Sequence, residues 1–392
     1  MPEPVHVPTT VPVPTTVPIP TTLADPTSPA TLFDLPGTVD TPSVVVDLDR
    51  LEANITGWAT WLAGRGVGLR PHTKTSKCLP IVERQVAAGV VGLTVATLGE
   101  AEVLADAGFD HLFQAYPLWA GHPGRAQRLR ALHERVELMV GVESADAASA
   151  LGRAVRGAAR ALPVLIELDP GMHRTGVDPV DVVALARACA DSGLDVRGAF
   201  TFGGHAYHAC DAPRAAADDE VRVLVEAADA LRAAGFEPTI LSAGSTPTAD
   251  GSARPPVTDE RPGVYVFQDR QQVGLGSAGW DDVAMVVATT VVASHADGRF
   301  VLDAGSKVLS SDRAPWLEGH GFLPAYPEAV VRSLSEHHAV AWTHGPQPRV
   351  GDVVALVPNH CCAVVNLVDE LVIAQRGAVV DVWPVSARGR NR

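Results

Sequence analysis

From about residue 37 to residue 275, short apolar runs alternate with alanine-rich stretches that have helical spacing. The eight apolar runs are "VGLRPHTK", "VVGLTVAT", "HLFQAYPL", "RVELMVGV", "PVLIELD", "VRGAFTFGG", "TILSAG" and "GVYVFQD". Stretches such as "LGEAEVLADAG" lie between them and stop at a glycine, as helix C-termini prefer. Strict alternation predicts parallel strands with crossover helices, and eight strands predict a (β/α)8 barrel. An open doubly wound sheet is the alternative on pattern alone.

The pattern changes at about residue 276 to β-branched runs broken by Asp-Gly, Gly-Asp and Arg-Gly turns. These runs predict an antiparallel β domain over residues 276–392, after a barrel over residues 37–275. An apolar strand near residues 41–48 precedes the barrel and is a candidate to pair into this later domain. The fold class predicted is therefore α/β, a TIM-type barrel followed by an antiparallel β domain.

The first 36 residues are unlike the rest, since "VHVPTTVPVPTTVPIPTT" repeats short Pro-Thr-Thr units. Proline at this density blocks helices and sheet ladders, so a disordered tail is expected there. The segment has neither a basic start nor a continuous apolar core, which argues against a signal peptide.

Composition limits the partners and the compartment. A net charge of −14 argues against nucleic acid and membrane surfaces as partners, because both are polyanionic. The sequence shows no apolar run long enough to span a bilayer. Five cysteines, odd in number and thinly spread, do not resemble a disulfide framework and indicate a reducing, cytoplasmic setting.

The stretch "RPHTKTSKC" at residues 70–78 places Lys74 at the end of the first predicted barrel strand. Active sites of such barrels lie at the C-terminal strand ends, where a desolvated lysine can have a lowered pKa. A Schiff-base lysine requires this lowered pKa, whereas an arbitrary lysine is ordinarily solvated surface. Lys77 is interpreted as an ordinary neighbour of Lys74.

Two loops after predicted strands carry further candidate chemistry. "LSAGSTPTADGS" at residues 241–252 follows the seventh strand and offers small residues with free backbone N–H groups, which a phosphate needs. A flexible turn is the alternative. "LDPGMHRTGV" at residues 168–177 places Arg174 after the fifth strand. An arginine there meets an anion, or pairs with Asp169 or Asp178.

The stretch "VPNHCCAVVNL" at residues 357–367 contains a candidate metal pair. In an extended strand His360 and Cys362 project on the same side, and Cys361 points the other way into packing. One imidazole and one thiolate are half of a zinc site and leave positions open for water or substrate, as in catalytic sites. A buried free cysteine beside a satisfied histidine is the alternative.

A lysine, a phosphate loop, a mouth arginine and an N/S metal pair together indicate pyridoxal-phosphate chemistry with an added Lewis acid. At these residues the sequence resembles the D-serine dehydratase and D-threonine aldolase family. Its members are fold-type III pyridoxal-phosphate enzymes related to alanine racemase. The resemblance runs from "DTPSVVVDL" to "WPVSARG", nearly the whole chain after the tail.

The resemblance implies a role for each motif residue. Lys74 is implied as the Schiff-base lysine, Arg174 as the partner of the pyridine nitrogen, and Tyr207 of "GGHAY" as a catalytic residue near the cofactor. His360 and Cys362 are implied as the metal ligands. Further cofactor contacts are implied for His72, Gly244, Ser245, Thr246 and Tyr265.

The metal motif also bears on the reaction. Family aldolases carry His-x-Asp and dehydratases His-x-Cys, so "HCC" here favours a dehydratase. A thiolate suits zinc, whereas a carboxylate suits manganese or magnesium. The resemblance thus implies a pyridoxal-phosphate- and zinc-dependent dehydratase that converts a D-β-hydroxy amino acid, D-serine first, to a keto acid and ammonia.

Alternatives to this reaction stay open. They are a metal-dependent D-threonine aldolase, an amino-acid racemase and a non-enzymatic pyridoxal-phosphate-binding protein. Ser76 stands where the family often has histidine, which bears on substrate preference. Relatives build the site between two subunits, so the resemblance implies a homodimer.

Overall fold

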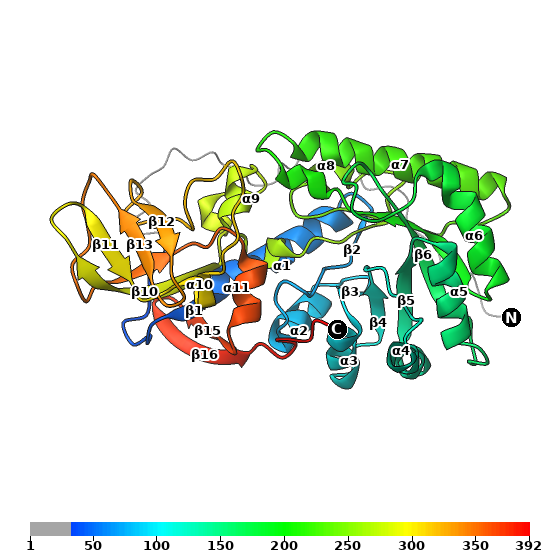
Figure 1. Cartoon of the computed structure of the whole chain (residues 1–392), viewed down its shortest axis with the longest axis horizontal. Helices are drawn as coiled ribbons and strands as arrows, with labels where there is room; N and C mark the ends of the chain where they lie inside the picture. Colours follow the sequence, from blue (N-terminus) through cyan, green and yellow to red (C-terminus); the bar gives the residue numbers. More distant parts are fainter. Residues whose placement is uncertain (1–32) are drawn as a thin grey trace, which may run out of the picture.

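The computed structural model describes residues 33–392 and contains two eight-stranded sheets (Figure 1). One sheet is parallel and lies in the cyan-to-green half of the molecule, and the other lies in the yellow-to-red half. The disordered tail predicted for residues 1–36 lies, except for residues 33–36, outside the described residues.

The parallel sheet forms a barrel. Its strands run in the order β2-β9-β8-β7-β6-β5-β4-β3, and a bridge between His72 and Thr94 joins the two ends. They are β2 (Gly68–Leu69), β3 (Leu93–Val95), β4 (His111–Gln114), β5 (Glu137–Val142), β6 (Pro163–Leu168), β7 (Asp195–Thr201), β8 (Ile240–Ala243) and β9 (Asp259–Glu260). Runs such as β5 are almost wholly buried because helices cover the outside of a parallel sheet. The predicted (β/α)8 barrel is confirmed.

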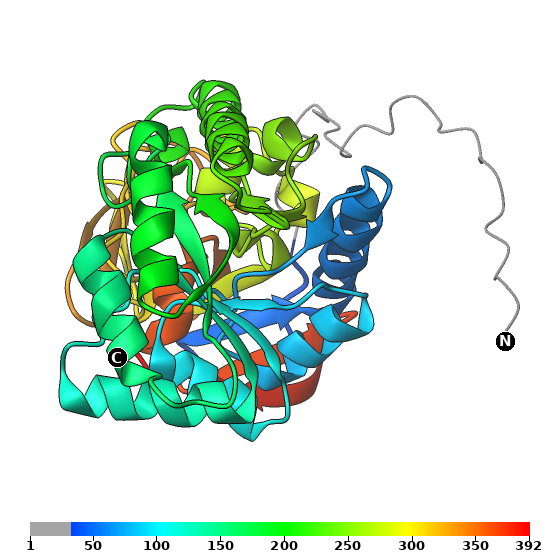
Figure 2. The ribbon, with the colours of Figure 1, turned by 90° about the vertical axis from the view of Figure 1, so that its right-hand side faces the viewer.

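Helices cover the outside of the barrel, as Figure 2 shows from the barrel end of the molecule. They are α1 (Leu48–Ala63), α2 (Leu79–Ala87), α3 (Leu98–Asp106), α4 (Pro123–Arg135), α5 (Ala145–Ala154), α6 (Val182–Asp191), α7 (Pro213–Ala233) and the short α8 (Ala249–Ser252). Their apolar positions recur at helical spacing: α7 buries Val221, Leu224, Ala228 and Leu231.

The eighth barrel strand differs from the prediction. The pattern places it at "GVYVFQD", whereas the structure has it at β9 and forms a 3-10 helix at Val264–Val266. All three residues of that helix are buried, so their apolar run reflects packing on every side and not strand pairing. The sequence pattern does not predict a strand at β9, because acidic residues normally lie on the surface. Here Asp259 is buried and pairs with Arg70 Nε at 3.1 Å.

The second sheet is largely antiparallel, in the order β12-β13-β11-β10-β1-β15-β16, with β14 paired to β10. Its strands are β1 (Ser43–Asp47), β10 (Met285–Ser294), β11 (Arg299–Leu302), β12 (Val330–Leu334), β13 (Ala339–Trp342), β14 (Val353–Leu356), β15 (Glu370–Gln375) and β16 (Ala378–Pro384). β1 pairs antiparallel with β10 and parallel with β15. The predicted antiparallel sheet is therefore confirmed, with one parallel pair added.

The two halves are connected several times. α1 follows β1 directly and leads into the barrel, and the chain returns through α9 (Arg270–Gly274). The short helices α10 (Ser306–Leu309) and α11 (Cys361–Leu367) interrupt the second sheet's strands. Residues 385–392 leave β16 and run back to the barrel beside α3 (Figure 1). There Ala387 N–H donates to the Lys77 carbonyl at 2.9 Å.

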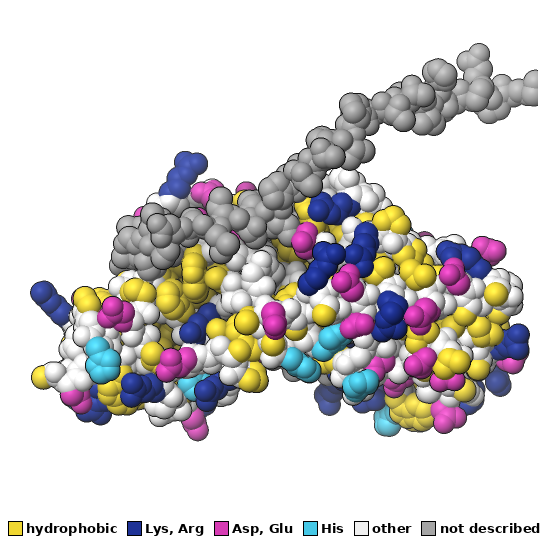
Figure 3. Space-filling view, turned by 90° about the horizontal axis from the view of Figure 1, so that it is seen from above, with side chains coloured by type: hydrophobic (Ala, Val, Ile, Leu, Met, Phe, Trp, Pro, Cys, Tyr) yellow, Lys and Arg dark blue, Asp and Glu magenta, His cyan; other side chains and the backbone are white. Residues whose placement is uncertain are grey.

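The surface carries charges of both signs. On the face shown in Figure 3, basic and acidic side chains are interspersed among apolar ones. Over residues 33–392 no helix has the length and apolar character that crossing a membrane requires.

Candidate active site

A cavity of about 300 Å³ lies where the C-terminal ends of the barrel strands meet the second domain. Loops after β2, β6, β7, β8 and β9 form most of its wall, and the second domain supplies the rest. The sequence-predicted residues that line it are His72, Lys74, Arg174, Tyr207, Gly244, Ser245, Thr246, His360 and Cys362. Fold topology thus brings together residues that lie almost 300 positions apart in the chain, as expected for a barrel mouth.

Lys74 follows β2 and points into the cavity, with its Nζ 5.9 Å from the centre of the Phe202 ring. Burial lowers the pKa of Lys74; the nearby Arg174 charge also lowers it, and Cys362 acts in the opposite direction. Burial, with the charges of Lys74 and Arg261, holds the pKa of His72 well below its ordinary value. Burial therefore shifts Lys74 towards the free amine and His72 towards the neutral imidazole, the forms that nucleophilic and proton-transfer chemistry use.

The loop after β8 fits a phosphate group. Gly244 has φ +87°, and a Cβ there would lie 1.3 Å from Glu260 Oε2, so only glycine fits. Thr246, Gly263 and Val264 line the cavity, and their backbone N–H groups have no acceptor within residues 33–392. Unpaired N–H groups that converge on a concave wall are the donors that a phosphate requires.

The two predicted tyrosines lie in different places. Tyr207 lines the cavity, and burial, with the negative charge of Asp269 nearby, raises its pKa well above the ordinary value. The Tyr207 hydroxyl therefore stays protonated. The Tyr265 side chain lies outside the cavity, where its hydroxyl accepts from Gln85 Nε2 at 2.9 Å. Its backbone N–H donates to Thr246 Oγ1 at 3.1 Å, so Tyr265 supports the loop from behind.

Arg174 lies at the exposed cavity mouth, with its guanidinium carbon 4.9 Å from the centre of the Phe202 ring. The alternative of an ion pair with Asp169 or Asp178 is absent from the described residues. Asp169 instead accepts from the His173 ring at 3.0 Å. Arg174 therefore keeps its charge available to a ligand in the cavity.

His360 and Cys362 both line the cavity, although the strand predicted for them is wrong. Cys361 begins α11, and His360 is the extended residue just before it, with φ −141°. Valines in "CCAVVNL" suggest a strand, yet α11 is a seven-residue helix packed into the core. Cys361 is fully buried and does not line the cavity. One extended step followed by a helical turn leaves both side chains facing Lys74's cavity.

Asp269 holds the histidine of this pair. It is fully buried, and its Oδ2 accepts from His360 Nδ1 at 3.1 Å and from the Cys361 N–H at 3.0 Å. A carboxylate on Nδ1 leaves Nε2 of the ring free to bind a metal ion. A hydrogen bond from Cys361 and the charge of His360 hold the pKa of Cys362 well below its usual range despite burial.

The donor set fits a catalytic metal and not a structural one. An imidazole nitrogen and an acidic thiol suit zinc, which prefers N and S ligands. Within residues 33–392 no cluster of three or more His, Cys, Asp or Glu side chains converges on one point. Two protein ligands leave the remaining positions to water or substrate.

Sequence reasoning missed several wall residues. They are Glu167, Phe200, Phe202, Arg261, Gly263 and Gln271, besides Asp269 behind His360. Arg261 is buried, and its Nη1 donates to Ser242 Oγ at 2.6 Å. Burial raises the pKa of Glu167, which accepts from Thr175 Oγ1 at 2.8 Å. A signal existed for Glu167, which is a charged residue inside the apolar strand β6, but not for Arg261, which follows the acidic β9.

Known proteins resemble the chain along nearly its whole described length. Residues 46–271 match the family described as "Alanine racemase, N-terminal domain", and residues 284–374 match the "Putative serine dehydratase domain". The chain is 35% identical over 353 residues to D-threo-3-hydroxyaspartate dehydratase of Delftia sp. (strain HT23), covering 83% of this chain and 92% of that protein. It is 31% identical over 379 residues to D-threonine aldolase of Arthrobacter sp, covering 93% and 97%.

The chain belongs to the D-serine dehydratase and D-threonine aldolase family. The solved Delftia dehydratase has a TM-score of 0.82 at 34% identity, covering 88% of this chain and 97% of that one. D-threonine aldolase from Filomicrobium marinum has a TM-score of 0.81 at 30% identity, covering 90% and 96%. A mutant of the dehydratase is known in a metal-free form. Enzymes of this family are lyases that use pyridoxal phosphate and a metal ion, and the cavity fits both.

Proposed function

We propose that this family member is a zinc-dependent dehydratase that converts a D-β-hydroxy amino acid to a keto acid and ammonia. The observation that carries the proposal is the location of His360 and Cys362 in the same cavity as Lys74. A carboxylate in place of Cys362 would suit manganese or magnesium and the aldolase reaction. A racemase or a simple cofactor carrier has no use for this metal pair.

Each of the cavity residues is proposed to have a separate role in the reaction. Lys74, as the free amine, takes up the Cα proton of the substrate, while the protonated Tyr207 hydroxyl donates a hydrogen bond. The N–H groups of Thr246, Gly263 and Val264 hold the phosphate of pyridoxal phosphate. Arg174 is proposed to face the pyridine nitrogen. When bound, pyridoxal phosphate supplies an electron sink for the charge left on Cα.

An arginine on the pyridine side gives up a proton only with difficulty, so departure of the β-hydroxyl needs separate help. His360 and Cys362 would hold a metal ion, whose chemistry there is polarisation of the substrate's β-hydroxyl. Asp269 keeps the His360 ring in place for this role. The same arrangement could hold a β-alkoxide during Cα–Cβ cleavage, and this is why an aldolase is the second candidate.

D-serine is the first substrate to test, and D-threo-3-hydroxyaspartate is the second, because a relative at 35% identity acts on it. The cationic side chains of the cavity are Lys74, Arg174 and Arg261 among the described residues. A substrate with a second carboxylate needs one of the two arginines as a partner. We further propose a homodimer, as the family resemblance implies.

The test combines a spectrum with product analysis. The purified protein, loaded with pyridoxal phosphate and Zn²⁺, should show a cofactor band near the visible edge and release pyruvate and ammonia from D-serine. A chelator should abolish this release. Lys74→Ala should lose the band and lower turnover by roughly 10²- to 10⁴-fold, because the base is removed. Lys307→Ala, at an exposed lysine of α10, is the control and should behave as wild type.

Other products would change the assignment. Glycine and an aldehyde from D-threonine, without keto acid from any of the substrates, would make the protein an aldolase. L-serine from D-serine would indicate a racemase. A protein that takes up no pyridoxal phosphate would overturn the proposal as a whole.

A further inference from the structure

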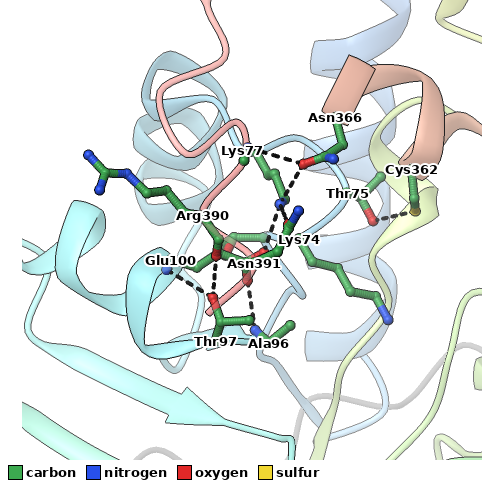
Figure 4. Close-up of polar contacts among 12 residues, drawn as sticks. Lys74, Thr75, Lys77, Ala96, Thr97, Glu100, Cys362, Asn366, Arg390 and Asn391 are labelled. Atoms are coloured by element: carbon green, nitrogen blue, oxygen red, sulfur yellow. Dashed lines mark hydrogen bonds and ion pairs between the residues drawn. The ribbon is translucent and has the colours of Figure 1, made fainter. Parts of the chain in front are cut away.

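Lys77 is not the surface residue that its sequence neighbourhood suggests. Only 7% of it is exposed, and it has φ +48°, a left-handed conformation that non-glycine residues rarely adopt. Its Nζ donates to Asn366 Oδ1 at 2.8 Å and to Asn391 Oδ1 at 2.9 Å, and it pairs with Glu100 Oε1 at 3.2 Å. Three acceptors satisfy all three ammonium protons. Figure 4 shows Lys77 and Lys74 on the same loop, with their side chains diverging.

The acceptors come from three different parts of the fold. Glu100 lies on α3, where its Oε2 also accepts from the Ala96 N–H at 2.7 Å. Asn366 lies on α11 one helical turn after Cys362, so both side chains are on one side of that helix. Asn391 belongs to residues 385–392, here called the C-terminal strap. Lys77 therefore joins the Lys74 loop to the helix that carries Cys362 and to the strap.

The strap is fastened to both halves of the molecule. Ala387 N–H donates to the Lys77 carbonyl at 2.9 Å, and Gly389 N–H donates to Asn366 Oδ1 at 3.3 Å. Beyond these, the Arg390 carbonyl accepts from Thr97 Oγ1, and the Arg392 carbonyl accepts from Gly99 N–H at 3.1 Å (Figure 4 shows the Thr97 contact). The strap thus closes over Lys77 and links the start of α3 to α11.

The Lys74 loop touches the metal pair directly at one further point. Thr75, between the two lysines, places its Oγ1 3.2 Å from Cys362 Sγ. Two fixed points, at Thr75 and at Lys77, determine how α11 is oriented relative to the loop. A shift of about 1 Å between catalytic groups can lower a rate by about 100-fold, so this orientation matters for the reaction.

We propose that Lys77 is a positioning residue that, through Asn366 and the strap residue Asn391, sets Cys362 and His360 at the correct place relative to Lys74. The inference rests on the proposed function, since it takes these two residues as metal ligands. The strap then acts as part of the metal site although none of its residues lines the cavity.

The test measures Zn²⁺ affinity by competition with a chromophoric chelator, using the full-length protein loaded with pyridoxal phosphate. Asn391→Ala removes one acceptor at an exposed position without changing charge and should weaken Zn²⁺ binding by about five- to tenfold. Asn391→Asp keeps an acceptor oxygen for Lys77 and should restore wild-type affinity. Arg390→Ala is the matched control, because this strap residue is exposed and binds the Thr97 hydroxyl through its backbone carbonyl, which the substitution keeps.

A double-mutant cycle separates positioning from mere stability. Lys77→Met should weaken Zn²⁺ binding by about tenfold or more, and adding Asn391→Ala to it should have no further effect, because both act through one contact. If Asn391→Ala lowers only the melting temperature and leaves Zn²⁺ affinity unchanged, the inference is overturned while the proposed function stands. A wild-type protein without Zn²⁺ affinity would overturn both.

Discussion

At the scale of single residues, Asp269 holds His360, one of the two proposed metal ligands, from outside the cavity. Both of its oxygens accept hydrogen bonds, Oδ2 from His360 and Cys361 and Oδ1 from the Gln272 N–H at 3.0 Å. We predict that Asp269→Asn lowers metal affinity by about 10- to 100-fold, because an amide nitrogen cannot accept from the ring and the charge is lost. Equilibrium dialysis with Zn²⁺ measures this. Asp281→Asn, at an exposed carboxylate, is the control, and equal affinities in both variants would refute the role.

Sequence reasoning at this scale succeeds where a residue's neighbours in the chain reveal its chemistry. Lys74 and the loop Gly244, Ser245 and Thr246 each sit in a local motif, and all four line the cavity. Lys77 and Tyr265 show the limit. The partners of Lys77 include Asn391, more than 300 residues away, so a buried lysine and a solvated one have the same local sequence. Only the folded structure shows that Lys77 is the buried and paired kind.

At the scale of elements, the loop between β8 and α8 depends on one glycine. Gly244→Ala places a methyl group against Glu260 at a positive φ, and we predict a loss of about 3 kcal/mol or more in the free energy of unfolding. Pyridoxal-phosphate affinity should fall with it if the loop holds the phosphate as proposed. Gly276→Ala is the matched control, since its φ is +74° but nothing lies within 4 Å of the added Cβ. Gly276→Ala should lower the free energy of unfolding by about 1 kcal/mol, and this loss should come from backbone strain alone.

Urea unfolding and cofactor titration of both variants give the comparison. Equal losses in the two variants would mean that strain alone, and not the Glu260 contact, makes Gly244 necessary.

Helices and strands were predictable where the periodicity of apolar residues was clear. The first seven barrel strands carry apolar runs, and the structure has a strand within each of them. β9 and α11 were misassigned for opposite reasons. β9 consists of two buried acidic residues, of which Asp259 pairs with Arg70, so it lacks a strand's apolar signature. α11 is short and valine-rich, and a seven-residue helix is too brief to show helical periodicity.

At the scale of the whole molecule, buried carboxyls inside the barrel should make stability depend on pH. Burial, and then the charge of Glu220, raises the pKa of Glu260 well above its ordinary value. Glu260 Oε1 accepts from Ser252 Oγ at 2.8 Å, while Oε2 has no partner among the described residues. The folded state therefore binds this proton more tightly than the unfolded chain does. The stabilisation that this proton gives to the folded state is complete below the unfolded pKa of about 4.3. It is lost as pH rises through the folded pKa.

Glutamine resembles the protonated form of Glu260. We therefore predict that Glu260→Gln makes the free energy of unfolding fall less steeply above pH 4.3, and that it raises this free energy at pH 8 by about 1 kcal/mol. Urea unfolding at several pH values measures the slope. Glu226→Gln, at an exposed position on α7, should leave the slope unchanged. A slope identical in wild type and Glu260→Gln would show that Glu260 does not titrate in this range.

Architecture at this scale followed from the sequence only in part. Alternating strands and helices predict the barrel, and the later β-branched runs predict a second sheet. How the two meet depends on contacts between distant residues, such as the C-terminal strap over Lys77, and the second sheet itself depends on the distant pair Val45 and Val372. Such contacts leave no periodic trace in the chain.

The position of β1 also has a consequence for synthesis of the protein. β1 is made before the barrel, but its partner strands β10 and β15 are made after it. A chain emerging N-terminus first therefore carries an unpaired apolar strand while the barrel folds. The wall with His360 and Cys362 is made after the barrel. The nascent chain thus holds Lys74 before these two residues exist, and the complete cavity arises only once the second domain has been made.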